Sequence, residues 1–194
     1  MYTFFRNLMA FIVRVLFGLR AEGLENIPEG GAVIAAAHSS FVDPVAVAGV
    51  VRRPIHFMAK AELFKYPVLR WILPRGHVFP VRRGLADRNA IRHAISVVTD
   101  GHLLGIFPEG TRSKSGEVQP LQGGAVMIAI KAGVPVVPVV VVGVKPLRLR
   151  RSVEVRIGKP IAFGEARRAG KEEISAAGEQ ISQQFTALLR RNLP

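Results

Sequence analysis

The stretch AVIAAAHSSFVDP, residues 32–44, has the pattern of a buried strand, a polar turn and the start of a helix. Ala32 to Ala37 form a short apolar run, which is typical of a strand buried on both faces. Pro44 has the fixed backbone torsion that suits the first turn of a helix, so Asp43 is predicted to be the N-cap. A strand followed by a helix indicates an α/β fold, in which ligands bind beyond the strand ends.

Two residues of this turn have the chemistry of a general base and its partner. His38 is the first polar residue after the strand, and Asp43 follows five positions later. A turn of this length lets the carboxylate reach back to the imidazole and hold it in one tautomer, ready to take a proton from a hydroxyl group. The spacing is equally compatible with an aspartate that only caps the helix and a histidine that only lines a loop.

The alternation of strands and helices continues along the chain. Strands are expected at 54–59, 76–84, 103–107, 134–144 and, as an outer strand, 152–160; helices are expected at 44–51, 88–99, 120–132 and 172–193. Asp87 is predicted to cap the helix that begins at Arg88. His56, inside the first of these strands, is interpreted as a packed histidine in preference to a ligand. The class predicted from this alternation is α/β.

The composition narrows the class of partner. A chain of 194 residues, 49% of them hydrophobic, fits one globular domain. The absence of cysteine excludes disulfides, thiolate nucleophiles and zinc–sulfur sites. A net charge of +13 indicates an anionic partner, which is a nucleic acid, an anionic membrane surface or a phosphate-bearing substrate. Nucleic acid is disfavoured, because aromatic residues are only 7% of the chain and no nucleic-acid-binding motif occurs.

The first residues have the pattern of an amphipathic helix. Residues 2–20 are apolar with a helical period, but Arg6 and Arg14 interrupt them, which disfavours both a membrane span and a signal peptide. We predict a helix in the membrane interface, with residues 1–21 as the anchor and 22–194 as the remaining domain. The alternative is a helix that packs on its own domain.

A second stretch mixes apolar and basic residues. AELFKYPVLRWILP, residues 61–74, contains aromatic and aliphatic side chains beside Lys65 and Arg70, and Pro67 should break any long helix. Such a mixture fits a second membrane-contacting surface or a wall against an acyl chain. Ordinary core packing is the third interpretation.

The other predicted strands also end in polar residues. If the strands are parallel neighbours, these ends share one edge of the sheet with His38. Guanidinium groups there would match phosphate oxygens, and Gly110 would let the backbone approach a ligand closely. We therefore expect a base that deprotonates a hydroxyl on a phosphorylated substrate. The residues concerned are Lys60, Arg82, Arg83, Glu109, Thr111 and Arg112.

Four segments resemble, in order and spacing, the four sequence blocks of the glycerolipid acyltransferases. They are HSSFVD at 38–43, GHVFPVR at 76–82, FPEGTRS at 107–113 and VPVVPV at 134–139. The branch resembled in particular is that of the bacterial 1-acylglycerol-3-phosphate O-acyltransferases. The resemblance implies a mixed, largely parallel sheet flanked by helices. It also implies transfer of an acyl chain from acyl-CoA or acyl-carrier protein to the sn-2 hydroxyl of 1-acylglycerol-3-phosphate (lysophosphatidate), giving phosphatidic acid.

The resemblance also implies roles for individual residues. His38 would be the general base and Asp43 would orient its imidazole, with no covalent acyl-enzyme, metal or cofactor. The segment 134–139 would line the acyl pocket. A serine nucleophile at Ser39 or Ser40 is disfavoured, because no glycine elbow surrounds them. The acceptor's phosphate would be bound by Lys60, Arg82, Glu109, Gly110, Thr111 and Arg112.

Two positions depart from the family pattern and bear on the acceptor. Val81 stands where an acidic residue is usual, and Leu121-Gln122 replaces a phenylalanine-lysine pair. Another lysolipid, an ornithine lipid or a glycolipid therefore remains as an alternative acceptor. A binding protein without chemistry is the alternative of a different class. The expected location is the cytoplasmic face of the cell membrane, with peripheral attachment to its anionic surface.

Overall fold

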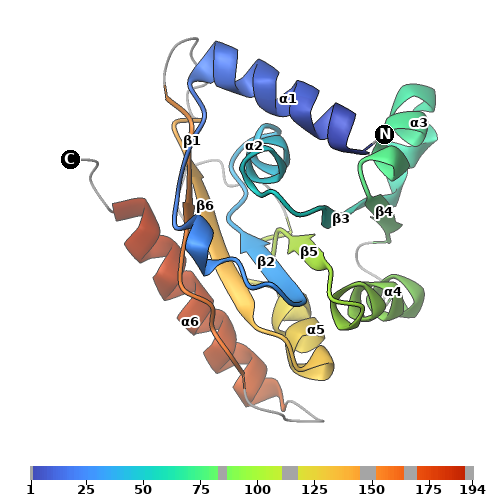
Figure 1. Cartoon of the computed structure of the whole chain (residues 1–194). Helices are drawn as coiled ribbons and strands as arrows, with labels where there is room; N and C mark the ends of the chain where they lie inside the picture. The colour runs from blue at the N-terminus through green and yellow to red at the C-terminus, as the bar shows by residue number, and fades with distance from the viewer. Residues whose placement is uncertain (1, 83–86, 111–117, 145–151, 164–169, 191–194) are drawn as a thin grey trace.

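The computed structural model describes residues 2–82, 87–110, 118–144, 152–163 and 170–190 (Figure 1). Within them, seven strands form one sheet in the order β1-β7-β6-β2-β5-β3-β4. None of the helices in these ranges is both long and apolar enough to span a membrane. The strands are β1 (Arg20–Glu22), β2 (Ala32–Ala36), β3 (Ile55–Lys60), β4 (Val78–Val81), β5 (Leu103–Ile106), β6 (Val136–Val142) and β7 (Glu154–Ile157).

Most of the sheet is parallel, as expected. β6, β2, β5, β3 and β4 all run the same way, whereas β7 is antiparallel to β6 and carries β1 parallel to itself. The predicted mixed, largely parallel sheet is therefore confirmed. β2 lies in the middle and all five of its residues are buried. Its carboxyl end, where the polar turn begins, shares one edge of the sheet with the ends of β5, β3 and β4.

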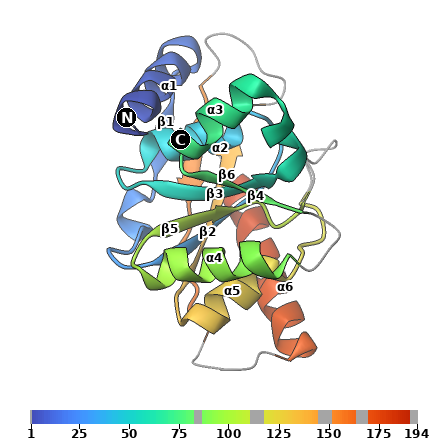
Figure 2. The same ribbon diagram turned by 90° about the vertical axis from the view of Figure 1, so that its right-hand side faces the viewer.

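Helices cover both faces of the sheet (Figures 1 and 2). α1 and α2 lie on one face with α3 beside them, and α4, α5 and α6 cover the other face. Alternate residues of β2 contribute to the two cores: Ile34 to the first, and Val33 and Ala35 to the second. The helices are α1 (Tyr2–Phe17), α2 (Asp43–Val50), α3 (Pro67–Arg75), α4 (Arg88–Thr99), α5 (Gly124–Ala132) and α6 (Lys171–Arg190), with short 3-10 helices η1 (Leu24–Asn26) and η2 (Ala61–Lys65).

The N-terminal helix ends earlier than predicted. α1 stops at Phe17, Gly18 follows with a φ of 61°, and the chain enters the sheet as β1. The predicted division after residue 21 therefore falls inside a strand. α1 packs on α2, and Val13 is buried in the first core. One face of this helix thus belongs to the domain, while its other face is exposed.

The prediction that residues 152–160 form an outer strand is wrong. β1 pairs along the free side of β7, and all four residues of β7 are buried. Arg156 Nη2 donates to Glu154 Oε2 at 3.0 Å, and Arg156 Nη1 donates to the carbonyl of Leu188 in α6 at 2.8 Å. Charged residues at alternate positions normally indicate a solvated face. Here α6 covers that face, and the two charges are buried as a pair.

Three histidines gather at the amino-terminal edge of the parallel strands, opposite the polar turn. The ring centroid of His56 lies 4.6 Å from that of His77 and 5.3 Å from that of His102. Burial, with the neighbouring histidines, lowers the pKa of His56 from 6.5 to about 4. His56 is therefore packed among other side chains, as interpreted from the sequence.

This cluster predicts a loss of stability at mildly acidic pH. Because the pKa of His56 is about 4 in the folded chain and 6.5 when it is unperturbed, the unfolded chain binds more protons between these values. The free energy of unfolding should decrease as the pH falls from about 6.5 towards 4. Urea unfolding across this range should give a shallower decrease for His56→Gln than for the unchanged chain. Equal slopes for the two proteins would contradict this account.

Candidate active site

The carboxylate of Asp43 organises the turn after β2. It is fully buried, and its Oδ2 accepts hydrogen bonds from the backbone N–H groups of Ser39 at 2.7 Å and Ser40 at 2.6 Å. The prediction that Asp43 is the helix N-cap is wrong, because α2 begins at Asp43 itself and Val42 is the cap residue. The carboxylate faces back into the turn, where it binds two N–H groups that would otherwise lack a partner.

His38 is held by the same carboxylate. Its Nδ1 lies 3.1 Å from Asp43 Oδ2, and its side chain is 16% exposed. An ionised carboxylate only accepts hydrogen bonds, so Nδ1 carries the proton and the lone pair is on Nε2. The predicted pairing of these two residues is confirmed as a geometry. An imidazole in this tautomer can take a proton from a bound hydroxyl group.

β5, which neighbours β2 in the sheet, supports His38 from a second side. Phe107 follows β5, and its ring centroid lies 4.3 Å from that of His38 with the planes inclined at 34°. Glu109 Oε1 accepts a hydrogen bond of 3.2 Å from the backbone N–H of His38. Asp43 thus holds the imidazole by a hydrogen bond to its ring. Phe107 packs on the same ring, and Glu109 holds the backbone of His38.

The family resemblance assigns Glu109 to substrate binding, but its side chain lies inside the protein. It is only 6% exposed, and its Oε1 accepts a hydrogen bond from the backbone N–H of His38. Burial raises the pKa of this carboxyl above its usual value, while the backbone N–H groups of His38 and Gln119 oppose that rise. Gly110 has a φ of 70°, a left-handed backbone conformation that favours glycine.

The two predicted basic residues within the described ranges, Lys60 and Arg82, lie on the same edge of the sheet as His38. Lys60 ends β3 opposite Val81 of β4, and its exposed Nζ lies 3.4 Å from Glu62 Oε1. Arg82 follows β4, is exposed, and donates its backbone N–H to Asp87 Oδ2 at 3.0 Å. Thr111 and Arg112, together with Arg83, lie outside the described residues.

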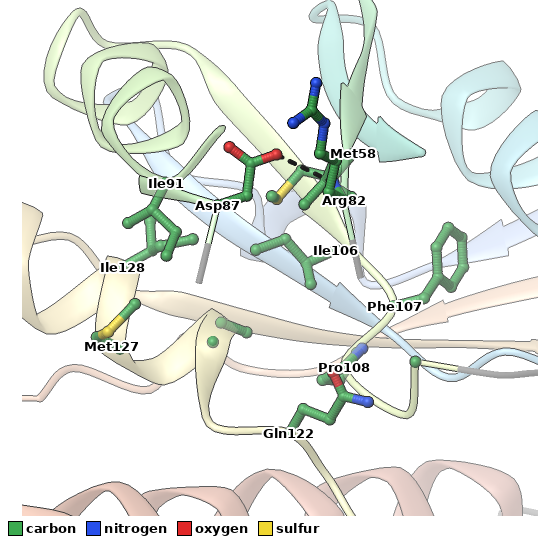
Figure 3. A pocket seen from close by; sticks show the side chains of 14 residues that line it. Met58, Arg82, Asp87, Ile91, Ile106, Phe107, Pro108, Gln122, Met127 and Ile128 are labelled. Atoms are coloured by element: carbon green, nitrogen blue, oxygen red, sulfur yellow. Dashed lines mark hydrogen bonds between the residues drawn. The ribbon is translucent and has the colours of Figure 1, made fainter. Parts of the chain in front are cut away.

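A cavity of about 340 Å³ opens at this edge, between the strand ends and helices α4 and α5 (Figure 3). Its polar lining includes Arg82, Asp87 and Gln122, and the guanidinium of Arg82 points away from the apolar side chains. The apolar lining includes Met58, Ile91, Ile106, Met127 and Ile128.

His38 does not line this cavity, but Phe107 lines it and also packs on the His38 ring. The residues that follow β5 therefore separate the base from the cavity. The contributions of α4 and α5 to the cavity are not predictable from the sequence. Their apolar residues show only an ordinary helical pattern. The predicted role of Asp87 as the cap of α4 is confirmed, because its Oδ1 accepts a 3.1 Å hydrogen bond from the N–H of Ala90.

No group of three or more histidine and acidic side chains within the described ranges could hold a metal ion. The described groups at this edge of the sheet supply a base, hydrogen-bond donors and acceptors, and positive charge. These groups suit a reaction that transfers a group to a hydroxyl oxygen.

Comparisons with known proteins agree with this chemistry. A family model described as Acyltransferase matches residues 18–142. A 1-acyl-sn-glycerol-3-phosphate acyltransferase from Bacillus subtilis is 34% identical over 97% of this chain and 96% of its own length. One from Streptococcus pneumoniae is 29% identical, over 96% of this chain and 72% of that protein.

The fold agrees as well. The crystal structure of the 1-acyl-sn-glycerophosphate (LPA) acyltransferase PlsC from Thermotoga maritima superposes with a TM-score of 0.75 and 26% identity. That match covers 100% of this chain and 83% of the Thermotoga chain. Because the family model matches more than half of the chain and a relative is similar over nearly its full length, the chain belongs to the acyltransferase family and is an acyltransferase.

Proposed function

We propose that the enzyme transfers an acyl chain from acyl-CoA or acyl-carrier protein to the sn-2 hydroxyl of 1-acylglycerol-3-phosphate, giving phosphatidic acid. The observation that carries this proposal is the His38–Asp43 pair, 3.1 Å apart, on the edge of the sheet that also carries Arg82. The names of the Bacillus and Streptococcus relatives support the same acceptor.

In this mechanism His38 Nε2 removes the proton from the acceptor hydroxyl as its oxygen attacks the thioester carbonyl. The tetrahedral intermediate then collapses, the carbon–sulfur bond breaks, and the imidazolium returns the proton to the leaving thiolate. Asp43 keeps the imidazole in the required tautomer and stabilises its positive charge. Glu109 does not contact substrate in this mechanism and acts as a positioning residue, because it holds the backbone of His38.

The acceptor's phosphate is bound by the guanidinium of Arg82, with Lys60, Thr111 and Arg112 as further donors. The apolar part of the cavity beside Arg82 takes an acyl chain, since its lining from α4 and α5 offers aliphatic and thioether groups only. A second candidate function is the same reaction on another lysolipid, an ornithine lipid or a glycolipid. It is favoured by Gln122, which lines the cavity at one of the two positions that depart from the family pattern.

We further propose that the enzyme is attached peripherally to the cytoplasmic face of the membrane through α1. Phe11 is 64% exposed and Val15 is 61% exposed on the outer face of this helix, with Leu8, Ile12 and Leu16 beside them. An amphipathic helix with this face lies in the interface between lipid headgroups and acyl chains.

A thiol-release assay tests the function. Free CoA should be released from acyl-CoA only when lysophosphatidate is present, and phosphatidic acid should accumulate in equal amount. Release that depends on a different lysolipid, an ornithine lipid or a glycolipid would favour the second candidate. No acceptor-dependent release from acyl-CoA or acyl-carrier protein would overturn both.

Replacing His38 tests the assignment of the base. His38→Ala should lower kcat by roughly 10²–10⁴-fold, the usual contribution of a positioned general base, while the circular dichroism spectrum is unchanged. His102→Ala is the matched control, because His102 is an exposed histidine before β5, at the other end of that strand. Near-normal turnover of His38→Ala would show that another group accepts the proton.

Replacing Arg82 tests the phosphate site. Arg82→Ala should raise the KM for lysophosphatidate by about tenfold or more, because a charged hydrogen bond contributes ~1.5–3 kcal/mol. The KM for acyl-CoA should not change. Lys131→Ala, which removes an exposed positive charge from α5, is the control. An unchanged acceptor KM in the Arg82 variant would remove this residue from the phosphate site.

Replacing the outer face of α1 tests the membrane anchor. Phe11→Ser combined with Val15→Ser should weaken binding to anionic liposomes by about tenfold or more, since each side chain loses part of the ~1.5–3 kcal/mol of full burial. Substitution is preferable to deletion, because Val13 of the same helix is buried in the core. Liposome flotation measures the effect, and unchanged flotation would assign membrane binding to another surface.

A further inference from the structure

We propose that α3 is a second membrane-contact surface and that the enzyme is seated on an anionic bilayer by two separate elements, α1 and α3. This inference rests on the proposed function in one respect, which is that the acceptor is a lipid. The proposed contact lies outside the N-terminal helix. Two contact elements would define the orientation of the active site relative to the bilayer.

One face of α3 exposes apolar side chains, while Leu69 and Leu73 are half-buried. Val68 is 67% exposed and Trp71 is 52% exposed, and Ile72 beside them is also exposed. Positions 68, 71 and 72 are spaced by three and four residues, so they lie on one face of the helix. No residue of α3 is buried or belongs to either hydrophobic cluster. Core packing, one of the interpretations open from the sequence, therefore does not account for this face of α3.

The position of α3 makes it a neighbour of the other exposed apolar face. α1, α2 and α3 lie on the same side of the sheet in both views, and the N-terminal end of α1 points towards α3 in Figure 1 (Figures 1 and 2). The turn that leads into α2 carries Phe41, which is 72% exposed and three residues from His38. Exposed apolar groups thus occur on α1, on α3 and in the turn that holds the base.

The chemistry of α3 fits an anionic lipid surface. From Leu63 to Arg75 the chain has three basic residues and no acidic one. The guanidinium of Arg75 lies 4.2 Å from the ring centroid of Trp71, which is a cation–π contact on this surface. Tryptophan and tyrosine favour the headgroup level of a bilayer, and each nearby lysine or arginine is attracted to anionic lipid. Tyr66, at the start of the helix, is also exposed.

A protein partner is a poorer fit to this face. An acidic carrier protein would be recognised through charge pairs at the edge of the contact, and the basic residues of this segment would be enough to form them. Charge pairs alone would leave the exposed aliphatic side chains of Val68 and Ile72 without a role. A bilayer uses both kinds of group, because aliphatic side chains enter the acyl region while cations remain among the phosphates.

Trp71 is the only tryptophan of the chain, so its fluorescence reports on this surface directly. The full-length protein is titrated with vesicles of equal parts phosphatidylcholine and phosphatidylglycerol. The emission of Trp71 should shift to shorter wavelength and should be quenched when the phosphatidylcholine carries brominated acyl chains. Vesicles that bind the protein without a shift or quenching of Trp71 would overturn the proposal. A shift caused by acyl-carrier protein without lipid would also overturn it and assign the face to protein docking.

A paired variant that keeps Trp71 provides a second measurement. Val68→Ser combined with Ile72→Ser should lower vesicle partitioning by about tenfold, equivalent to ~1.4 kcal/mol. Leu24→Ser is the matched control, since Leu24 is 43% exposed and follows β1 at the opposite edge of the sheet. Equal partitioning of the two variants would contradict a role for α3.

The reaction itself is measured separately, with acyl-CoA and detergent-dispersed lysophosphatidate. The α3 variant should keep its normal turnover in detergent and lose activity only on vesicle-borne acceptor. If the enzyme without substitutions is inactive in detergent, the result counts against the proposed function and not against the proposed role of α3. A variant that loses turnover in detergent would show that α3 serves the fold or the chemistry, contrary to the inference.

Discussion

The buried carboxylate of Asp43 is the group on which the arrangement of the site depends. A charge removed from water is costly unless hydrogen bonds replace its hydration. Here two backbone N–H groups and the His38 ring surround one carboxylate oxygen. These bonds close the turn after β2 and orient the imidazole together. Removing the carboxylate would therefore affect the fold of the turn and the chemistry at once, and for this reason the tests of catalysis replace His38.

The parallel sheet explains why residues distant in sequence meet around this turn. Parallel neighbours end at the same edge, and β5 lies directly beside β2. The segment after β5 consequently contacts His38 with Phe107 and Glu109, and it also lines the cavity on the other side. In the proposed reaction, the hydroxyl and the acyl chain approach this segment from opposite sides. A change in the residues after β5 would then affect both substrates, whereas a change in α4 or α5 would affect the cavity alone.

Much of this arrangement follows from the sequence, because it depends on local patterns. Apolar runs gave the order of strands and helices, and the five-residue spacing predicted the His38–Asp43 contact. The errors concern features that depend on tertiary neighbours. The carboxylate of Asp43 accepts hydrogen bonds from the turn before the helix, and the charged residues of β7 are covered by α6, far along the chain. The inward orientation of Glu109 and the composition of the cavity depend likewise on packing between elements, which no single segment encodes.

The two faces of α1 have a mechanical consequence for an enzyme that acts on lipids. A flexible anchor would leave the catalytic domain free to tumble above the bilayer, so the base would meet a lipid hydroxyl in few orientations. α1 is not such an anchor, because Val13 is part of the core and β1 follows the helix within the sheet. A bilayer that holds α1 therefore holds the sheet as well. If α3 is a second contact, as proposed, rotation about the α1 axis is also restrained, and the turn with His38 stays at the bilayer surface.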